Sequence, residues 1–353
     1  MNVKQVIEQA TAWVEREGRQ IPGFCGAHLM GGILSMPPDA PFPLYRDVDL
    51  NIVVRDTAHG TVTHDVAVGE LILEYSTVSL QRYRTAEEVL SNPELAANLA
   101  ANSILVDPDG LLLPLQRSVA TQYAHRQWVQ ARCAYEQQIV MRALEGLRGA
   151  ATPPEALWFL SNIALFLSGL LAEASLRPPT HRRCLVLLRD VLHAAGRRDL
   201  HEATLQLLGW AHLRRHEVEG YLHDCALAFD LATAVSRTPV PFQVKFQPHV
   251  RPYIIAGAQE MIEQGYHREA MFWIAGFLMF ANTAIQADAP AAEQPRFQGM
   301  LDRLMTQMGL SVPTAVATRV REAGLLIDAI VAVADALIEQ RSEAGQLLSV
   351  SAT

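Results

Sequence analysis

Two aspartates, Asp47 and Asp49, stand one residue apart in the stretch 45–54, where polar and aliphatic side chains alternate. Alternation with a period of two predicts a β-strand, on which both carboxylates point to the same side with their α-carbons about 7 Å apart. From that spacing the two carboxylates can reach one hard cation, or a pair of cations about 4 Å apart. The acidic pair therefore indicates a candidate divalent-metal site.

The opposite face of this predicted strand is entirely aliphatic, which suits a protein core. Its members are Val48, Leu50, Ile52 and Val54. The two carboxylates, which share their face with Asn51, repel one another unless a metal or a basic group compensates. A solvent-facing edge of an amphipathic strand has the same pattern, and Asp-x-Asp alone is a weak signal. The glycine pair before it and the acidic strand after it favour a site.

A third acid follows in a second predicted strand, residues 66–78, which also alternates. Glu74 lies inside the apolar run 71–75, where an acidic side chain is unusual unless it has a partner or a function. If it faces the two aspartates, it completes an oxygen-ligand site of the type that magnesium uses with nucleotide phosphates. Glu70 is the alternative third acid, and for either residue the competing interpretation is the polar face of an ordinary strand.

These residues, together with the segment from His28 to Gly32, resemble the nucleotidyltransferase domain of the DNA polymerase β-like superfamily. Within that superfamily the likeness is greatest to the antibiotic-modifying adenylyltransferases of the aminoglycoside type. The family pattern is a Gly-Ser or Gly-Gly pair, Asp-x-Asp on a strand, and a third acid on a later strand. Residues 102–110 also resemble the closing strand and turn of that domain.

The resemblance implies a magnesium-dependent transfer of a nucleoside monophosphate, most simply AMP from ATP, to a hydroxyl of a small molecule. An antibiotic is one candidate acceptor. On this basis Asp47 and Asp49 are the magnesium ligands, and Gly31 and Gly32 lie against the triphosphate. Glu74 is either a third ligand or the base that takes the proton of the acceptor hydroxyl. Magnesium and ATP, or another nucleoside triphosphate, are thus the expected cofactor and co-substrate.

Two other functions fit the same residues. Gly32 stands where many members of the family have Ser, and the loop 33–46 carries prolines at positions 37, 38, 41 and 43. Both features favour a nucleotidyltransferase-fold protein that no longer catalyses and serves as a nucleotide sensor or interaction module, whereas the intact acidic pair favours an enzyme. The third hypothesis is a toxin-like enzyme that modifies a protein or RNA.

The charge of the chain is unevenly distributed. Residues 1–116 contain 7 Lys and Arg against 15 Asp and Glu, whereas residues 117–353 contain 22 of each, so the whole net charge of −8 lies in the first segment. An acidic domain repels nucleic acid and attracts cations, which suits a polycationic acceptor such as an aminoglycoside. An ordinary acidic surface has the same balance. We expect no nucleic-acid partner.

From about residue 117 the sequence changes from strand patterns to helix patterns, with Pro and Gly at the boundaries. The expected fold class is α+β, with a small mixed β-sheet nucleotidyltransferase domain over residues 1–116 and an all-helical domain over residues 117–353. The first domain is expected to begin with an amphipathic helix that ends at Gly18. The helices predicted for the second are 118–147, 154–176, 181–195, 199–217, 218–236, 251–265, 267–287, 294–308 and 313–342.

Three aromatic or basic residues at the start of the helical region, Trp128, Arg132 and Tyr135, have two interpretations. They directly follow the first domain, so they could reach a bound nucleotide. Helix packing at a domain junction explains them equally well.

Two uncharged stretches, 156–172 and 270–287, are at the edge of membrane-spanning length. Both contain polar residues and lack basic flanks of the topological kind, so we expect buried core helices and no membrane partner. The cysteines show no paired spacing, which indicates a reducing compartment. The cytoplasm is the expected location.

Overall fold

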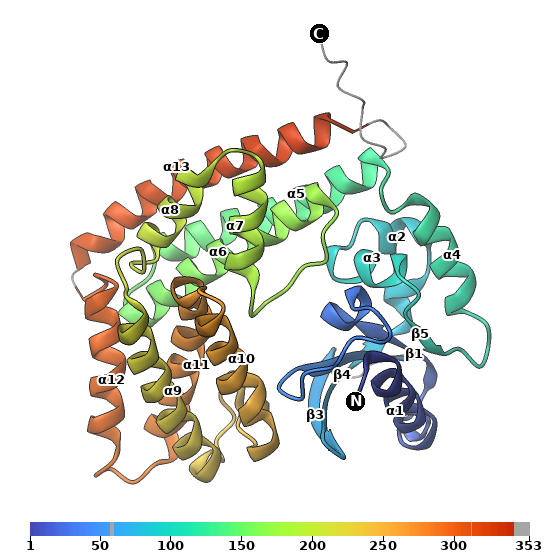
Figure 1. The fold of residues 1–353 in the computed structure, drawn as a ribbon, viewed down its shortest axis with the longest axis horizontal. Coiled ribbons are helices and arrows are strands. Elements are labelled where there is room, and N and C mark those ends of the chain that lie inside the picture. Colours follow the sequence, from blue (N-terminus) through green and yellow to red (C-terminus); the bar gives the residue numbers. More distant parts are fainter. Residues whose placement is uncertain (57–59, 312, 342–353) are drawn as a thin grey trace. The chain divides into compact units, whose positions relative to one another are not determined.

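The structure is a computed structural model that describes residues 1–56, 60–311 and 313–341 (Figure 1). Over these residues a mixed five-stranded sheet in the first part of the chain is followed by a long series of helices. The fold class is therefore α+β, as the sequence predicted.

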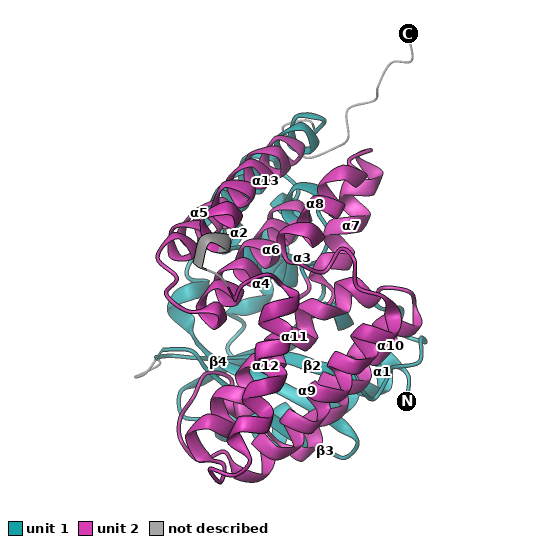
Figure 2. Cartoon of the chain, turned by 90° about the vertical axis from the view of Figure 1, so that its left-hand side faces the viewer, with its two compact units in different colours: residues 1–135, 173–179, 335–353 teal, residues 136–172, 180–334 magenta. Residues whose placement is uncertain are grey.

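The chain forms two compact units (Figure 2). Unit 1 contains residues 1–135, 173–179 and those from Asp335 on, and unit 2 contains residues 136–172 and 180–334. The units do not coincide with the predicted segments 1–116 and 117–353. The prediction followed the change from strands to helices, whereas the units follow packing, and the helices at the start of the helical region pack with the sheet domain.

The sheet of unit 1 has the strand order β3-β4-β2-β1-β5. The strands are β1 (Phe24–Met30), β2 (Asp47–Val54), β3 (Val62–Val68), β4 (Leu71–Ser79) and β5 (Ile104–Val106). Strands β2 and β4 are parallel neighbours, and the other pairs are antiparallel. Strand β2 is central in the sheet, and its side chains are buried from Leu50 to Val54.

The stretch 66–78 was predicted as a single strand, and this is wrong. It contains a turn at Gly69 and Glu70, on either side of which β3 and β4 pair antiparallel with Val68 opposite Leu71. Gly69 has a φ of +61°, which glycine adopts without strain. Because a two-residue turn barely interrupts the alternation of side chains, the period alone did not separate the two strands.

Helices cover both faces of the sheet. Helix α1 (Val3–Arg16) packs on one face, where the aliphatic side of β2 is buried as predicted. Helices α2 (Ala86–Leu90), α3 (Pro93–Ala100) and α4 (Leu112–Gln122) pack on the other. Val53 of β2 is buried in this second core, so the face that begins with the two aspartates becomes apolar further along the strand.

The sequence did not predict α2 and α3. Each begins at a side-chain cap, with Thr85 accepting from the Glu88 amide and Asn92 accepting from the Glu94 amide.

The predicted helix 118–147 is two helices, α4 and α5, and the predicted helix 199–217 ends at Leu207. The remaining helices are α5 (Arg126–Arg148), α6 (Pro153–Ser175), α7 (Cys184–Ala194), α8 (Arg198–Leu207), α9 (Arg215–Val235), α10 (Arg251–Glu263), α11 (His267–Asp288), α12 (Gln294–Gln307) and α13 (Pro313–Glu339).

Two of the described helices, α6 and α11, are long and apolar enough to cross a membrane by length and composition alone. Of their most apolar stretches, 56% and 61% respectively are buried within the protein. More than half of each stretch is thus packed against other parts of the protein.

Arg132 of α5 is fully buried in unit 1 and connects its helix to three other elements. Its guanidinium donates to the carboxylate of Glu173 on α6, to the Leu90 carbonyl at 2.9 Å and to the Tyr123 carbonyl at 3.1 Å. It also lies 4.4 Å from the centre of the Tyr123 ring. Burial raises the pKa of Glu173, and the adjacent Arg132 opposes that rise. Of the two interpretations of Arg132, the structure supports packing.

Replacing one member of this pair should be costly, because it leaves the other charge buried without compensation. We expect Arg132→Met to lower the free energy of unfolding by about 3–5 kcal/mol, and Arg132→Met with Glu173→Leu to recover most of that loss. Urea denaturation followed by circular dichroism measures both. Arg197→Met, which removes an exposed partner of Asp199, is the control and should leave the midpoint unchanged. A double variant as unstable as the single one would contradict this account.

Candidate functional site

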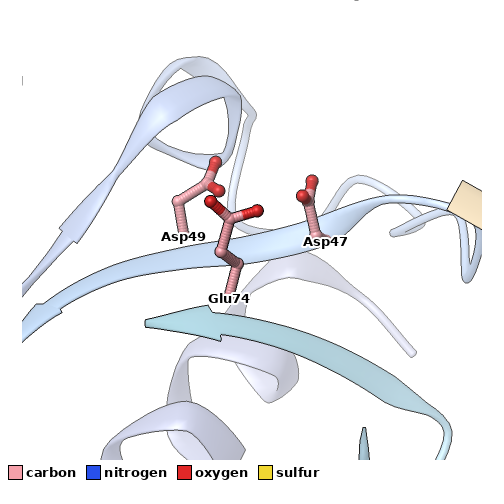
Figure 3. Close-up of side chains that lie close together, drawn as sticks. All are labelled: Asp47, Asp49 and Glu74. Carbon is pink, nitrogen blue, oxygen red and sulfur yellow. The ribbon is translucent and has the colours of Figure 1, made fainter. Parts of the chain in front are cut away.

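The carboxylates of Asp47, Asp49 and Glu74 gather on one face of the sheet in unit 1 (Figure 3). One oxygen of each lies within 4.8 Å of an oxygen of the other two, and all three residues are half-buried. Asp49 and Glu74 stand directly opposite one another in the parallel ladder of β2 and β4. Among the described residues, this is the only group of three or more His, Cys, Asp and Glu side chains placed closely enough to hold a metal ion.

The local cause of this arrangement is the two-sided character of β2. Its aliphatic side chains are buried against α1, so the alternating residues Asp47 and Asp49 must point to the other face. A slip of one residue in the pairing would turn the carboxylates into the apolar core. The burial of the aliphatic face therefore determines where the acids lie.

Glu70 does not join the cluster. It lies in the turn between β3 and β4 and is exposed. The structure thus brings Glu74, and not the alternative acid, to the two aspartates. The sequence separated the two poorly because it placed both on one strand.

A further acid, Asp65 of β3, was missed. It is directly opposite Glu74 in the antiparallel ladder and is only 6% exposed. Asp49, Glu74 and Asp65 therefore form a row across three adjacent strands. Like charges directly opposite one another destabilise a sheet, and a divalent cation relieves that repulsion. Recognition of the turn at Gly69 would have paired the two strands as a hairpin and placed Asp65 opposite Glu74.

The two glycines before β2 have different surroundings. Gly31 has a φ of +70° and begins the short 3-10 helix η2 (Gly31–Ser35) at the end of β1. A Cβ atom at this position would collide with the Asp49 carboxylate. A Cβ atom at Gly32 would meet nothing within 4 Å. Gly31 is thus required by its backbone conformation and by its contact with the candidate site, whereas Gly32 borders open space.

A buried polar chain lies beside the acidic row. The Nδ1 atom of His28 is 3.0 Å from the Leu29 carbonyl, which can only accept, so Nδ1 carries the proton. The Nε2 atom then accepts from the Tyr83 hydroxyl at 2.9 Å, and Asn51 donates to the same hydroxyl oxygen at 3.1 Å. Burial lowers the pKa of His28 to about 4 and raises the pKa of Tyr83. This group of three hydrogen-bonded side chains is therefore neutral at pH 7, and Asn51 has a structural role within it.

The sequence matches no protein-family model and no curated protein. Among solved structures, a nucleotidyltransferase-like protein from Exiguobacterium sibiricum 255-15 is similar over 86% of this chain and 92% of its own, with 14% sequence identity and a TM-score of 0.32. At that TM-score the similarity does not establish a function for this chain.

The unequal surroundings of the two glycines lead to a paired prediction. Gly31→Ala should lower the melting temperature and weaken Mn2+ binding at least several-fold, because alanine is strained at this φ and its methyl group displaces Asp49. Gly32→Ala should fold and bind Mn2+ like the parent. Thermal denaturation and calorimetric titration with Mn2+ measure the two effects. If the two variants have the same melting temperature and the same affinity for Mn2+, Gly31 is not required for the site.

The buried His28 should make stability depend on pH. Its folded-state pKa, about 4, lies below the ordinary 6.5, so its neutral form stabilises the fold above pH 6.5 and this contribution is lost as the pH falls towards 4. The loss corresponds to roughly 3 kcal/mol. We expect the unfolding free energy of His28→Gln to fall less steeply over this range than that of the parent, as measured by urea denaturation at several pH values. Parallel pH profiles would show that His28 is not the responsible group.

Proposed function

We propose that this protein is a magnesium-dependent nucleotidyltransferase that transfers a nucleoside monophosphate, AMP from ATP, to a hydroxyl group of a small molecule. The observation that carries the proposal is the convergence of Asp47, Asp49 and Glu74 on neighbouring strands. The adjacent turn at Gly31 and Gly32 supports the proposal. Neither glycine has a side chain, so a phosphate can approach the backbone closely there.

The donor set fits magnesium. It consists of carboxylate oxygens without Cys or His, and hard cations such as magnesium prefer oxygen ligands at about 2.0–2.1 Å. Oxygens that lie within 4.8 Å of one another can share one such ion, or border two, after small side-chain rotations. Asp47 and Asp49 would hold the metal, and Glu74 stands close enough to be a third ligand. The ion would neutralise the phosphate charges of the nucleotide.

In the proposed reaction the acceptor oxygen attacks the α-phosphorus of ATP and forms a new oxygen–phosphorus bond. The bond from the α-phosphorus to the oxygen that bridges to the β-phosphorus breaks, and pyrophosphate leaves. The hydroxyl proton passes to the carboxylate of Glu74 where that residue acts as the base, which requires hydrogen-bond reach to the acceptor. Most of the remaining work is positioning and charge neutralisation, as in phosphoryl transfer generally.

The acceptor class is proposed from charge. The net charge of −8 lies within residues 1–116, which include the acidic row of the sheet. Such a domain attracts cationic ligands at long range, so a polycationic, hydroxyl-rich molecule such as an aminoglycoside antibiotic is the first acceptor to test. The cytoplasm, where ATP is available, is the location that we propose with it.

Substitution of each acid separates the roles. Asp47→Asn should abolish magnesium-dependent ATP binding in calorimetry while leaving folding intact, because it removes charge repulsion. Glu74→Gln should retain ATP binding and lose turnover by about 10²–10⁴-fold if Glu74 is the base. Glu70→Gln, in the exposed turn of the same hairpin, is the matched control and should behave like the parent.

The measurement is release of pyrophosphate and formation of adducts with magnesium, labelled ATP and a panel of aminoglycosides. Equal ATP affinity in Asp47→Asn and the parent would overturn the metal assignment. ATP binding by the parent without pyrophosphate release on any acceptor would favour the non-catalytic nucleotide sensor.

A further inference from the structure

A buried asparagine of α3, Asn98, connects that helix to the turn beside the candidate site. Its side chain is 8% exposed. Its Oδ1 atom accepts from the backbone amide of Gly31 at 3.0 Å, and its Nδ2 atom donates to the carbonyl of Glu94 at 2.7 Å. Because an amide group can donate only through nitrogen, the two bonds together define the orientation of the side chain.

The bond to Gly31 meets a specific need of the backbone. The first amides of a helix have no acceptor within it, and Gly31 opens the 3-10 helix η2. The Gly31 amide is part-buried, and a backbone amide shielded from water without an acceptor is costly, so Asn98 both satisfies this amide and holds its turn. No side chain within the turn itself caps this end of η2.

The position of Gly31 in turn constrains Asp49. The Gly31 backbone lies so close to the Asp49 carboxylate that no Cβ atom fits between them. A carboxylate packed against a fixed backbone has fewer rotamers available than one beside open space, so less of its freedom is lost when it binds a cation. The contacts thus run from α3 through Asn98 and Gly31 to Asp49.

We infer that Asn98 is a positioning residue of the metal site: by holding the Gly31 turn against Asp49, it pre-organises the carboxylate for a divalent cation. This inference rests on the proposed function for the metal site itself. The hydrogen bonds of Asn98 go to the backbone of Gly31 and Glu94 and not to the three acids, and nothing in the spacing of the sequence indicated it, because α3 was not predicted.

The test compares two substitutions of similar size. Asn98→Leu removes both hydrogen bonds, and it should raise the Kd for Mn2+ by about 10-fold and the Mg2+ concentration needed for half-maximal turnover in parallel. Asn98→Asp keeps an acceptor for the Gly31 amide but loses the donor to the Glu94 carbonyl and adds a negative charge, so it should hold the turn and bind Mn2+ at least as tightly as the parent. Hydrogen exchange of the Gly31 amide should be faster in the Leu variant and unchanged in the Asp variant.

Asn92→Ala is the control for a merely structural effect. It removes the cap of the same helix α3, where Asn92 accepts from the Glu94 amide at 2.9 Å, so it should destabilise α3 without changing the Kd for Mn2+. If the parent binds Mn2+ and Asn98→Leu binds it equally well, or if Asn92→Ala weakens binding as much as Asn98→Leu, the inference is overturned and the proposed function stands. If the parent itself binds neither Mn2+ nor Mg2+, the proposed metal function fails, and the role of Asn98 fails with it.

Discussion

The parallel pairing of β2 and β4 is the constraint on which the candidate site depends. It places Asp49 directly opposite Glu74, and Asp47 two residues earlier on the same face. The register of this pairing follows from hydrophobic burial, because the alternate residues Leu50 and Leu73 are buried against α1. A shift of one residue would exchange the buried and acidic faces. The energy that holds the acids together is thus supplied on the opposite side of the sheet.

The hairpin of β3 and β4 extends the acidic row by placing Asp65 beside Glu74. Such a row opposes folding through like-charge repulsion, and it is tolerated where a cation or another positive partner compensates. A buried polar group beside the row is uncharged. His28 is kept neutral by burial and joins Tyr83 and Asn51 in a satisfied hydrogen-bond chain. This buried hydrogen-bonded group therefore adds no charge beside the carboxylates.

The backbone around Gly31 constrains the position of the Asp49 carboxylate. The collision that a Cβ atom would make with Asp49 and the hydrogen bond from the Gly31 amide to Asn98 define one position for the turn. Elsewhere in unit 1 the buried pair of Arg132 and Glu173 joins α5 and α6 to the carbonyls that end α2 and α4. The first arrangement serves the candidate site, whereas the second serves packing, although both use buried polar groups.

Local features of this protein could be predicted from its residues alone. Alternation showed that Asp47 and Asp49 share one face of a strand, an acid within an apolar run indicated Glu74, and helical spacing located most of the later helices. The pairing of strands depends on tertiary contacts, so the row that includes Asp65 and the role of Asn98 were missed, whereas the turn at Gly69 was missed because it barely interrupts the alternation. The physical reason is that periodicity reports the side on which a residue lies and contains no information about the residue opposite it. That partner is chosen by the burial of distant apolar faces and by hydrogen bonds between segments far apart in the chain.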